Sequence, residues 1–131
     1  MPKITLLFAS LHVLLMLLLA VRVVGHRRTV KIGLGDGGDK LLAKKVRAHA
    51  NFVEYVPMAL ILLGLLELSG LGAMWLWISG GALLLGRVLH AVGLSRSAGV
   101  SFGRFWGTLL TWGALLFMAG LGIGMTLGWQ G

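Results

Sequence analysis

Four polar side chains lie close together within the run RAHANFVEYVP, which covers residues 47–57. They are Arg47, Asn51, Glu54 and Tyr55. At about 100° per residue of an α-helix, the last three lie at about 40°, 340° and 80° from the first, so all four share one face. Each ionised group at the centre of a bilayer costs roughly 2.5–3.5 kcal/mol, so such residues are seldom kept without a partner or a task. This face, which we call the polar stripe, is the candidate site.

The elements that must position this stripe are long apolar segments. The chain has 131 residues, of which 57% are hydrophobic and 12% charged, whereas soluble domains average about 25% charged residues. The apolar segments cover residues 4–24, 41–68, 71–94 and 102–127. Each reaches the ~20 residues that a helix needs to cross the hydrocarbon core, where backbone groups must be bonded within the segment. The sequence therefore predicts an all-α integral membrane protein, with residues 1–131 forming a single bundle of four transmembrane helices.

The basic residues indicate how the chain crosses the membrane. Eight of them cluster between the first two apolar segments: Arg22, Arg27, Arg28, Lys31, Lys40, Lys44, Lys45 and Arg47. Arg96 and Arg104 flank the last connection. Under the positive-inside rule, the loops at residues 25–39 and 95–101 face the cytoplasm, and both termini lie on the non-cytoplasmic side. Because topology explains the net charge of +8, we expect no nucleic-acid partner.

Several other classes of site or segment are not favoured. The chain has no cysteine, so it has neither a disulfide framework nor a thiol nucleophile of its own. Its four histidines form no H-x-x-x-H or Glu-x-x-His pattern, so we expect no metal site. The run GLGDGG at residues 33–38 fits G-x-G-x-x-G, but no strand precedes it, so we interpret it as a polar turn. The first segment could be a cleaved signal peptide, but its long apolar run without an A-x-A site favours a retained helix.

Arg87 is a further ionisable residue inside an apolar segment, and His90 follows it three residues later. Two interpretations are open. Arg87 lies about five residues inside the loop, close enough for its side chain to snorkel to the interface. Alternatively, it pairs with Glu54 on a neighbouring helix. The similar depth of the two residues favours pairing, because an unpaired buried charge is costly.

Glycines four residues apart mark the last apolar segment. The pairs are Gly103 and Gly107, Gly120 and Gly124, and Gly124 and Gly128. Small residues at this spacing let helices approach closely, either within the bundle or between subunits. A four-helix monomer also has little interior in which to place charged groups, so we expect the protein to form oligomers.

In combination, these features resemble bacterial members of the MAPEG family, the membrane-associated proteins in eicosanoid and glutathione metabolism. The resemblance rests on RAHANFVEYVP, preceded by GLGDGG and followed by LILLGLLELSG and LLLGRVLHAVGL, and it is strongest over residues 31–94. It implies a homotrimer of four-helix subunits, with glutathione bound between neighbouring subunits near the cytoplasmic face. It also implies a location in a bacterial inner membrane.

The resemblance further implies roles for individual residues. Five match positions that contact glutathione: Arg47, Asn51, Glu54 and Tyr55 on the second helix, and Arg87 on the third. Arg104 matches the catalytic arginine credited with holding the thiolate, and Arg22 is a weaker match to another glutathione-binding arginine. One departure concerns the third helix, where eicosanoid-making relatives carry a tyrosine soon after the arginine. This chain offers Ala91 and Leu94 there.

The expected function is therefore a membrane-bound glutathione-dependent transferase or peroxidase. Glutathione would be the co-substrate, and its activated thiol would attack a lipophilic electrophile or peroxide from the bilayer. Slow conjugation, or glutathione binding without turnover, stays open because the third-helix tyrosine is missing. The alternative is a non-catalytic membrane subunit or scaffold, whose intramembrane charges form structural ion pairs. A small transporter is less favoured, because no charged residues line a route to the far side.

Overall fold

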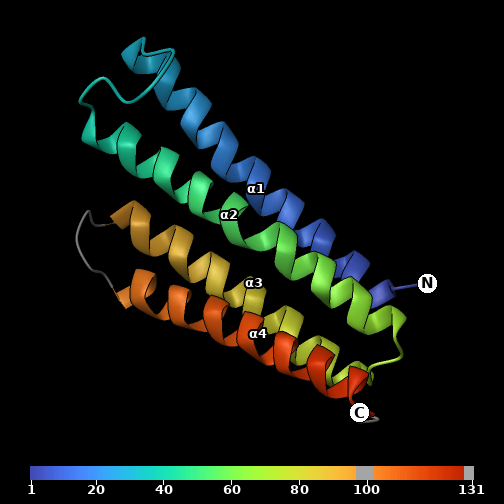
Figure 1. Ribbon diagram of the computed structural model, residues 1–131. Coiled ribbons are helices and arrows are strands. Elements are labelled where there is room, and N and C mark those ends of the chain that lie inside the picture. Colours follow the sequence, from blue (N-terminus) through green and yellow to red (C-terminus); the bar gives the residue numbers. More distant parts are fainter. Residues whose placement is uncertain (97–101, 129–131) are drawn as a thin grey trace.

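The protein forms four antiparallel helices connected in sequence order, as the computed structural model shows for residues 1–96 and 102–128. The helices are α1 (Lys3–Val30), α2 (Lys40–Leu68), α3 (Ala73–Arg96) and α4 (Phe102–Thr126). All four are long and apolar enough to cross a membrane. The start of α1 and the end of α4 lie at one end of the bundle, which we call the terminal end (Figure 1). The segment at residues 31–39 lies at the other end, which we call the loop end. The predicted four-helix, all-α architecture is thus confirmed.

The first helix is longer than the sequence predicted. The apolar run stops at Val24, but α1 continues to Val30, so residues 25–30 are helical and not part of a loop. The hydropathy of a segment indicates only which part of a helix contacts lipid. A helix can continue into water as long as its backbone hydrogen bonds are maintained. The helix ends at Lys31, which adopts a left-handed conformation with φ of 55°. The Asp39 carboxylate then begins α2 by accepting a hydrogen bond of 2.6 Å from the Leu42 amide.

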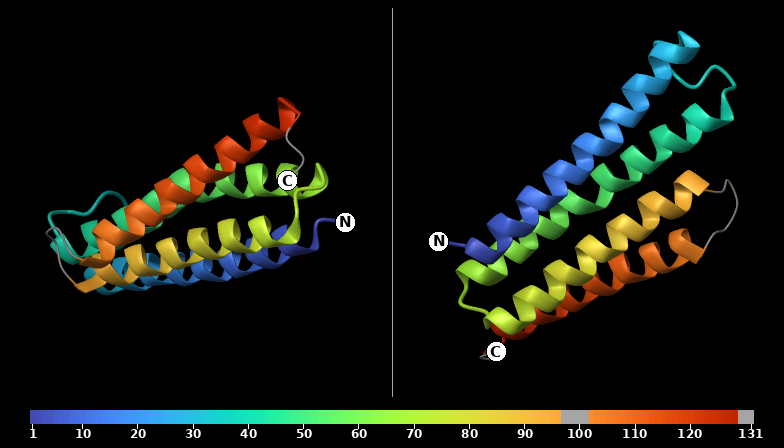
Figure 2. Two further views of the ribbon diagram at one scale, coloured as in Figure 1. Left: turned by 90° about the horizontal axis from the view of Figure 1, so that it is seen from below. Right: turned by 180° about the vertical axis from the view of Figure 1, so that it is seen from behind.

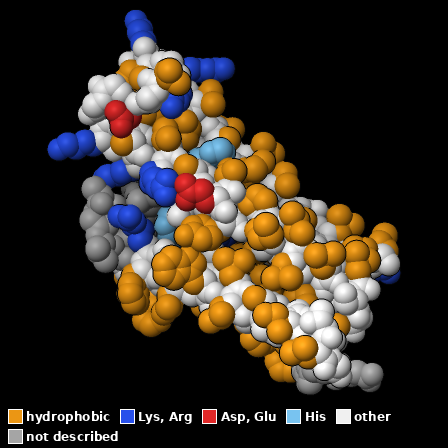
Figure 3. Space-filling model, in the orientation of Figure 1, with side chains coloured by type: hydrophobic (Ala, Val, Ile, Leu, Met, Phe, Trp, Pro, Cys, Tyr) orange, Lys and Arg blue, Asp and Glu red, His pale blue; other side chains and the backbone are white. Residues whose placement is uncertain are grey.

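Every pair of helices except α1 and α4 packs together within the described residues (Figure 2). Nine apolar side chains contributed by all four helices and the α2–α3 connection form the larger core cluster, which includes Phe8, Leu63 and Met118. A second cluster includes Leu19, Phe52 and Ala91. Large apolar side chains also cover much of the outer surface, and lysine and arginine gather toward the loop end (Figure 3). This distribution suits a bundle surrounded by lipid.

The α3 and α4 backbones touch through glycines near the loop end. A Cβ atom on Gly107 would lie 2.6 Å from the His90 amide nitrogen, and one on Gly93 would lie 2.5 Å from the Arg104 amide nitrogen. Such contacts leave no room for a side chain. The packing role predicted for Gly103 and Gly107 is therefore confirmed within the bundle. It holds His90 and Arg104 next to each other.

Candidate functional site

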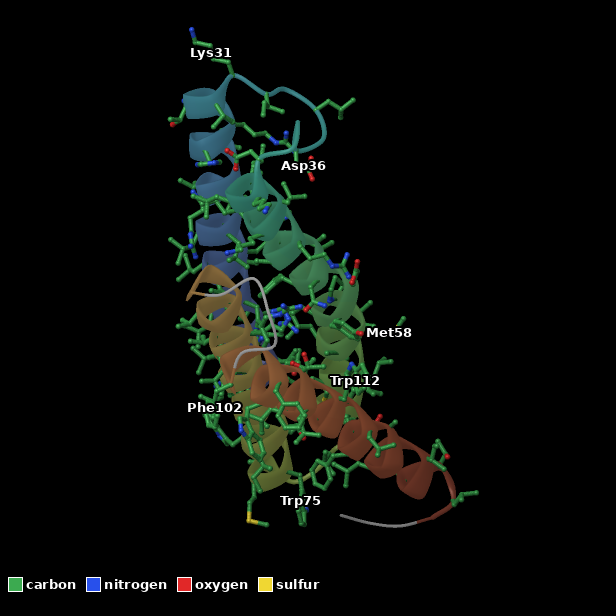
Figure 4. All side chains as sticks on the ribbon, turned by 90° about the vertical axis from the view of Figure 1, so that its left-hand side faces the viewer. Lys31, Asp36, Met58, Trp75, Phe102 and Trp112 are labelled. Atoms are coloured by element: carbon green, nitrogen blue, oxygen red, sulfur yellow. The ribbon has the colours of Figure 1, made fainter. Side chains whose placement is uncertain are left out.

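A cavity of about 460 Å³ lies where α2, α3 and α4 meet near the loop end. Its lining residues are Arg47, Asn51 and Tyr55 from α2, His90 from α3, and Arg104, Phe105, Thr108, Leu109 and Trp112 from α4. Trp112 projects from α4 toward the side of α2 that carries Met58 (Figure 4). Four of the seven predicted site residues therefore line one cavity: Arg47, Asn51, Tyr55 and Arg104.

Glu54 joins this group through an ion pair along α2. The Arg47 Nη1 and Nη2 atoms donate to Glu54 Oε1 and Oε2 at 3.0 and 3.1 Å, two helical turns apart. Both side chains are largely accessible, with exposed fractions of 59% for Arg47 and 47% for Glu54. Both charges are thus open to a ligand that approaches the outer face of α2.

Arg87 lies inside the bundle and is only 2% exposed. Its Nη2 donates to Asn51 Oδ1 at 2.7 Å, and its Nη1 donates to Thr111 Oγ1 at 3.4 Å. Within the described residues, no carboxylate lies within ion-pair distance of Arg87. Both sequence interpretations of Arg87 were therefore wrong. The side chain is buried, so it does not snorkel, and Glu54 pairs with Arg47 on its own helix because its side chain is directed outward.

The hydrogen bonds of Arg87 link three helices. The Thr111 hydroxyl, which accepts from Arg87, in turn donates to the Gly107 carbonyl within α4 at 2.7 Å. The acceptors that Arg87 reaches are an amide and a hydroxyl, and both are neutral. The buried positive charge is consequently solvated mainly by dipoles, and the Glu54 carboxylate acts on it only from beyond ion-pair distance. Two further arginines line the cavity beside it.

Five of the nine lining residues were not assigned to the site by the sequence analysis, and His90 is the ionisable one among them. It is 5% exposed, and its Nδ1 has no hydrogen-bond partner among the described residues. The charges of Arg87, Arg104 and Arg47 all act on its ring. A signal was available in the sequence, because His90 follows Arg87 by three residues and therefore shares its helix face.

Arg22 does not join this cavity within one subunit. It lies in a separate groove of about 250 Å³ between α1 and α3, which is otherwise apolar. Ala91, one of the residues at the position of the missing tyrosine, is buried against the second core cluster. The side chain of Leu94 lies outside the described residues.

The arrangement can recognise a small ligand that carries both signs of charge. Three guanidinium groups suit carboxylates, one carboxylate suits an ammonium group, and Asn51 suits a peptide amide. Phe105, Leu109 and Trp112 provide an apolar wall on the same cavity, and each of these side chains is also exposed on the outer surface. No group of three potential metal ligands of the His, Cys, Asp or Glu type occurs in the described part of the chain.

Comparison with known proteins agrees with this description. A model of the MAPEG family matches residues 5–124, a range that contains all seven predicted site residues. The inner membrane protein YecN of Escherichia coli strain K12 is 36% identical over 112 residues, covering 86% of this chain and 84% of YecN. YecN of E. coli O6:H1 strain CFT073 gives the same values. With four membrane-spanning helices and this match, the protein is a multi-pass integral membrane protein and belongs to the MAPEG family.

Proposed function

We propose that this protein binds glutathione in the cavity and uses it as the co-substrate of a membrane-bound transferase or peroxidase. The observation that carries this proposal is the buried Arg87 charge, whose hydrogen-bond acceptors are neutral, beside a cavity lined by Arg47 and Arg104. A buried cation with no carboxylate at ion-pair distance favours the binding of an anion. Glutathione carries two carboxylates, one ammonium group and one thiol, so it has a net negative charge.

The Arg47–Glu54 pair matches one end of this ligand. The γ-glutamyl end of glutathione carries an ammonium and a carboxylate group on the same carbon. Each of these groups can replace one partner of the accessible ion pair, Glu54 taking the ammonium and Arg47 the carboxylate. Asn51 and Tyr55 line the cavity beside them and can bond to the peptide groups of the ligand.

Arg104 is the residue to which we assign thiol activation. A free thiol has a pKa of about 8.5, so only a few per cent is ionised at neutral pH. A guanidinium group beside the sulfur favours the thiolate and lowers that pKa. The thiolate then attacks a lipophilic electrophile or peroxide that enters past Phe105 and Trp112, both of which are exposed on the outer surface.

The proposal includes a homotrimer with glutathione between subunits. Arg22 supports this arrangement, because its groove lies between α1 and α3, so it could contribute to a glutathione site only in a neighbouring copy. A groove of about 430 Å³ on α4, lined by Leu116, Phe117, Gly120, Leu121 and Gly124, offers a surface for such a copy. The concentration of basic residues at the loop end supports a cytoplasmic position for that end, and YecN is described as an inner membrane protein.

Difference absorbance of the thiolate tests this proposal in the detergent-purified protein. We expect a saturable thiolate signal on titration with glutathione, and no signal with S-methylglutathione, which has no ionisable thiol. Arg104→Ala should abolish the signal, whereas Arg28→Ala, at an exposed position outside the cavity, should leave it unchanged. A signal of equal size in Arg104→Ala would remove Arg104 from the mechanism.

A second candidate function is a non-catalytic membrane subunit. The bonds of Arg87 to Asn51 and Thr111 favour it, because they join α2, α3 and α4 without any ligand. Glu54→Gln separates the two functions. If the substitution breaks the oligomer and leaves glutathione affinity unchanged, the charges are structural, whereas the reverse result supports the enzyme.

A further inference from the structure

His12 is a buried histidine on α1 that belongs neither to the polar stripe nor to the cavity. Its side chain is 1% exposed, and its Nδ1 lies 2.7 Å from the Phe8 carbonyl oxygen. A carbonyl oxygen can only accept, so Nδ1 carries the proton of this hydrogen bond. In the neutral imidazole, Nε2 is then an acceptor. It has no partner among the described residues.

Arg87 has a buried hydrogen-bond donor that lacks an acceptor. Its two terminal nitrogens donate to Asn51 and Thr111, but its Nε–H, which is also buried, has no acceptor in the described part of the chain. Arg87 Nε–H is thus a buried donor without an acceptor, and His12 Nε2 is a buried acceptor without a donor, among the described residues. Both are costly where lipid surrounds the protein and bulk water is absent. Three other buried polar atoms, on Thr5, Ser79 and His90, also lack a partner among the described residues.

The two groups approach the same aromatic ring. Phe52 of α2 is 2% exposed, and its ring centroid lies 6.0 Å from that of His12 and 5.9 Å from Arg87 Cζ. The charge of Arg87 also acts on His12. The His12 ring of α1 and the Arg87 guanidinium group of α3 therefore both lie beside Phe52.

We infer that at least one internal water molecule bridges Arg87 Nε–H and His12 Nε2, and that this link makes His12 a positioning residue for Arg87. Water can accept from the first group and donate to the second, which satisfies both. Buried waters typically bond to polar groups that otherwise lack partners.

The link orients the guanidinium plane. The bond to Thr111 is long at 3.4 Å, so without a bond at Nε only the contact with Asn51 would hold the group firmly. With Nε bonded as well, α1 fixes the direction in which Arg87 presents its charge toward Asn51 at the cavity. This consequence rests on the proposed function, but the water bridge itself does not.

Nitrogen-15 NMR of histidine-labelled protein tests the bridge directly. We expect His12 Nε2 to have the chemical shift of a hydrogen-bonded acceptor and to show exchange contacts with water. Arg87→Lys removes the Nε–H donor, so it should move the His12 signal toward that of a free acceptor. A free-acceptor shift in the unmodified protein, or an unchanged signal in Arg87→Lys, would overturn the bridge.

Glutathione titration tests the positioning role. His12→Phe keeps a ring against Phe52 but removes both nitrogens, and we expect the affinity for glutathione to fall about tenfold. His12→Gln retains an acceptor and should restore most of the affinity. Ser79→Ala is the matched control, because Ser79 Oγ is also buried without a partner among the described residues but does not line the cavity.

A double substitution separates positioning from general damage to the fold. If His12 acts through Arg87 Nε, then His12→Phe should cause no further loss of affinity in the Arg87→Lys background. Unchanged affinity in a folded His12→Phe variant, or fully additive losses, would overturn the positioning role. If the unmodified protein does not bind glutathione at all, the proposed function and the positioning role both fail, and the NMR measurement still decides whether the bridge exists.

Discussion

The two carboxylates of α2, Glu67 near the terminal end and Glu54 halfway along the helix, have different environments. At the terminal end, Glu67 accepts hydrogen bonds from the backbone amides of Ile4 and Thr5 at 2.9 and 2.7 Å. It thereby caps α1, whose own N-cap residue, Pro2, provides no side-chain bond. Halfway along α2, Glu54 bonds to the guanidinium group of Arg47, and both side chains are accessible. The fold uses the carboxylate of Glu67, whereas that of Glu54 is available to a ligand.

The glycines of α4 repeat this difference. Gly107 lies against the α3 backbone, while a Cβ atom on Gly120 would meet nothing within 4 Å. Close packing at the loop end therefore positions the cavity residues, and the open surface near the terminal end is available to lipid or to another subunit. Three substitutions and one change of pH test whether the two regions differ in this way.

The largest effect is expected for Gly107→Ala. The added methyl group would overlap the His90 backbone, forcing α3 and α4 apart at a cost of about 1–3 kcal/mol. Glutathione affinity should fall as well, because His90 and Arg104 would separate. Thermal unfolding and ligand titration measure the two effects. Gly120→Ala is the control and should change neither; equal destabilisation by both would contradict the comparison.

Glu67→Gln should lower stability by about 2 kcal/mol, since the charge-assisted cap of α1 becomes a neutral one. Glutathione affinity should stay the same, because Glu67 lies outside the cavity. Denaturant or thermal unfolding in detergent gives the first quantity, and titration gives the second. Loss of affinity without loss of stability would show that the terminal end also serves the ligand.

Glu54→Gln should have the opposite effects, with little change in stability and a loss of glutathione affinity. Stability should change less than in Glu67→Gln, because the Arg47–Glu54 pair lies within one helix and joins no two elements. Glutathione affinity should fall about tenfold, since the ligand's ammonium group loses its carboxylate partner. In the same titration, the glutathione affinity of the conservative Glu54→Asp variant should lie between those of the unmodified protein and Glu54→Gln. A Glu54→Gln variant that binds glutathione normally would place the ammonium group elsewhere.

The smallest effect concerns pH at the start of α2. The hydrogen bond from the Leu42 amide, with help from His26, holds the pKa of Asp39 below its ordinary value of 3.8. A lowered carboxyl pKa contributes stability that is present above the ordinary value and is lost as the pH falls through the lowered one. The protection of the Leu42 amide against hydrogen exchange, measured relative to its intrinsic exchange rate at each pH, should therefore fall below about pH 4. Asp39→Asn keeps a capping oxygen without the charge. In this variant the protection of the Leu42 amide should show no such dependence on pH.

Periodicity and hydropathy predicted much of this protein because they depend on one element at a time. The four membrane helices follow from the length of the apolar runs. The polar stripe follows from helical geometry alone, and Arg47 and Glu54 do pair along it. The end of α1 was missed by six residues because hydropathy does not measure helix length outside lipid.

The class of protein, its family and the shared face of residues 47–55 could therefore be predicted from the amino-acid sequence, because all three depend on local spacing. Which groups meet across helices depends on how the four helices pack. Arg87 turned inward to Asn51 and away from Glu54, Arg22 lies in a different groove, and Glu67 caps another helix. The same spacing permits each residue several partners. The rotation of each helix about its axis, set by glycine contacts and the packing of large side chains, selects one of them.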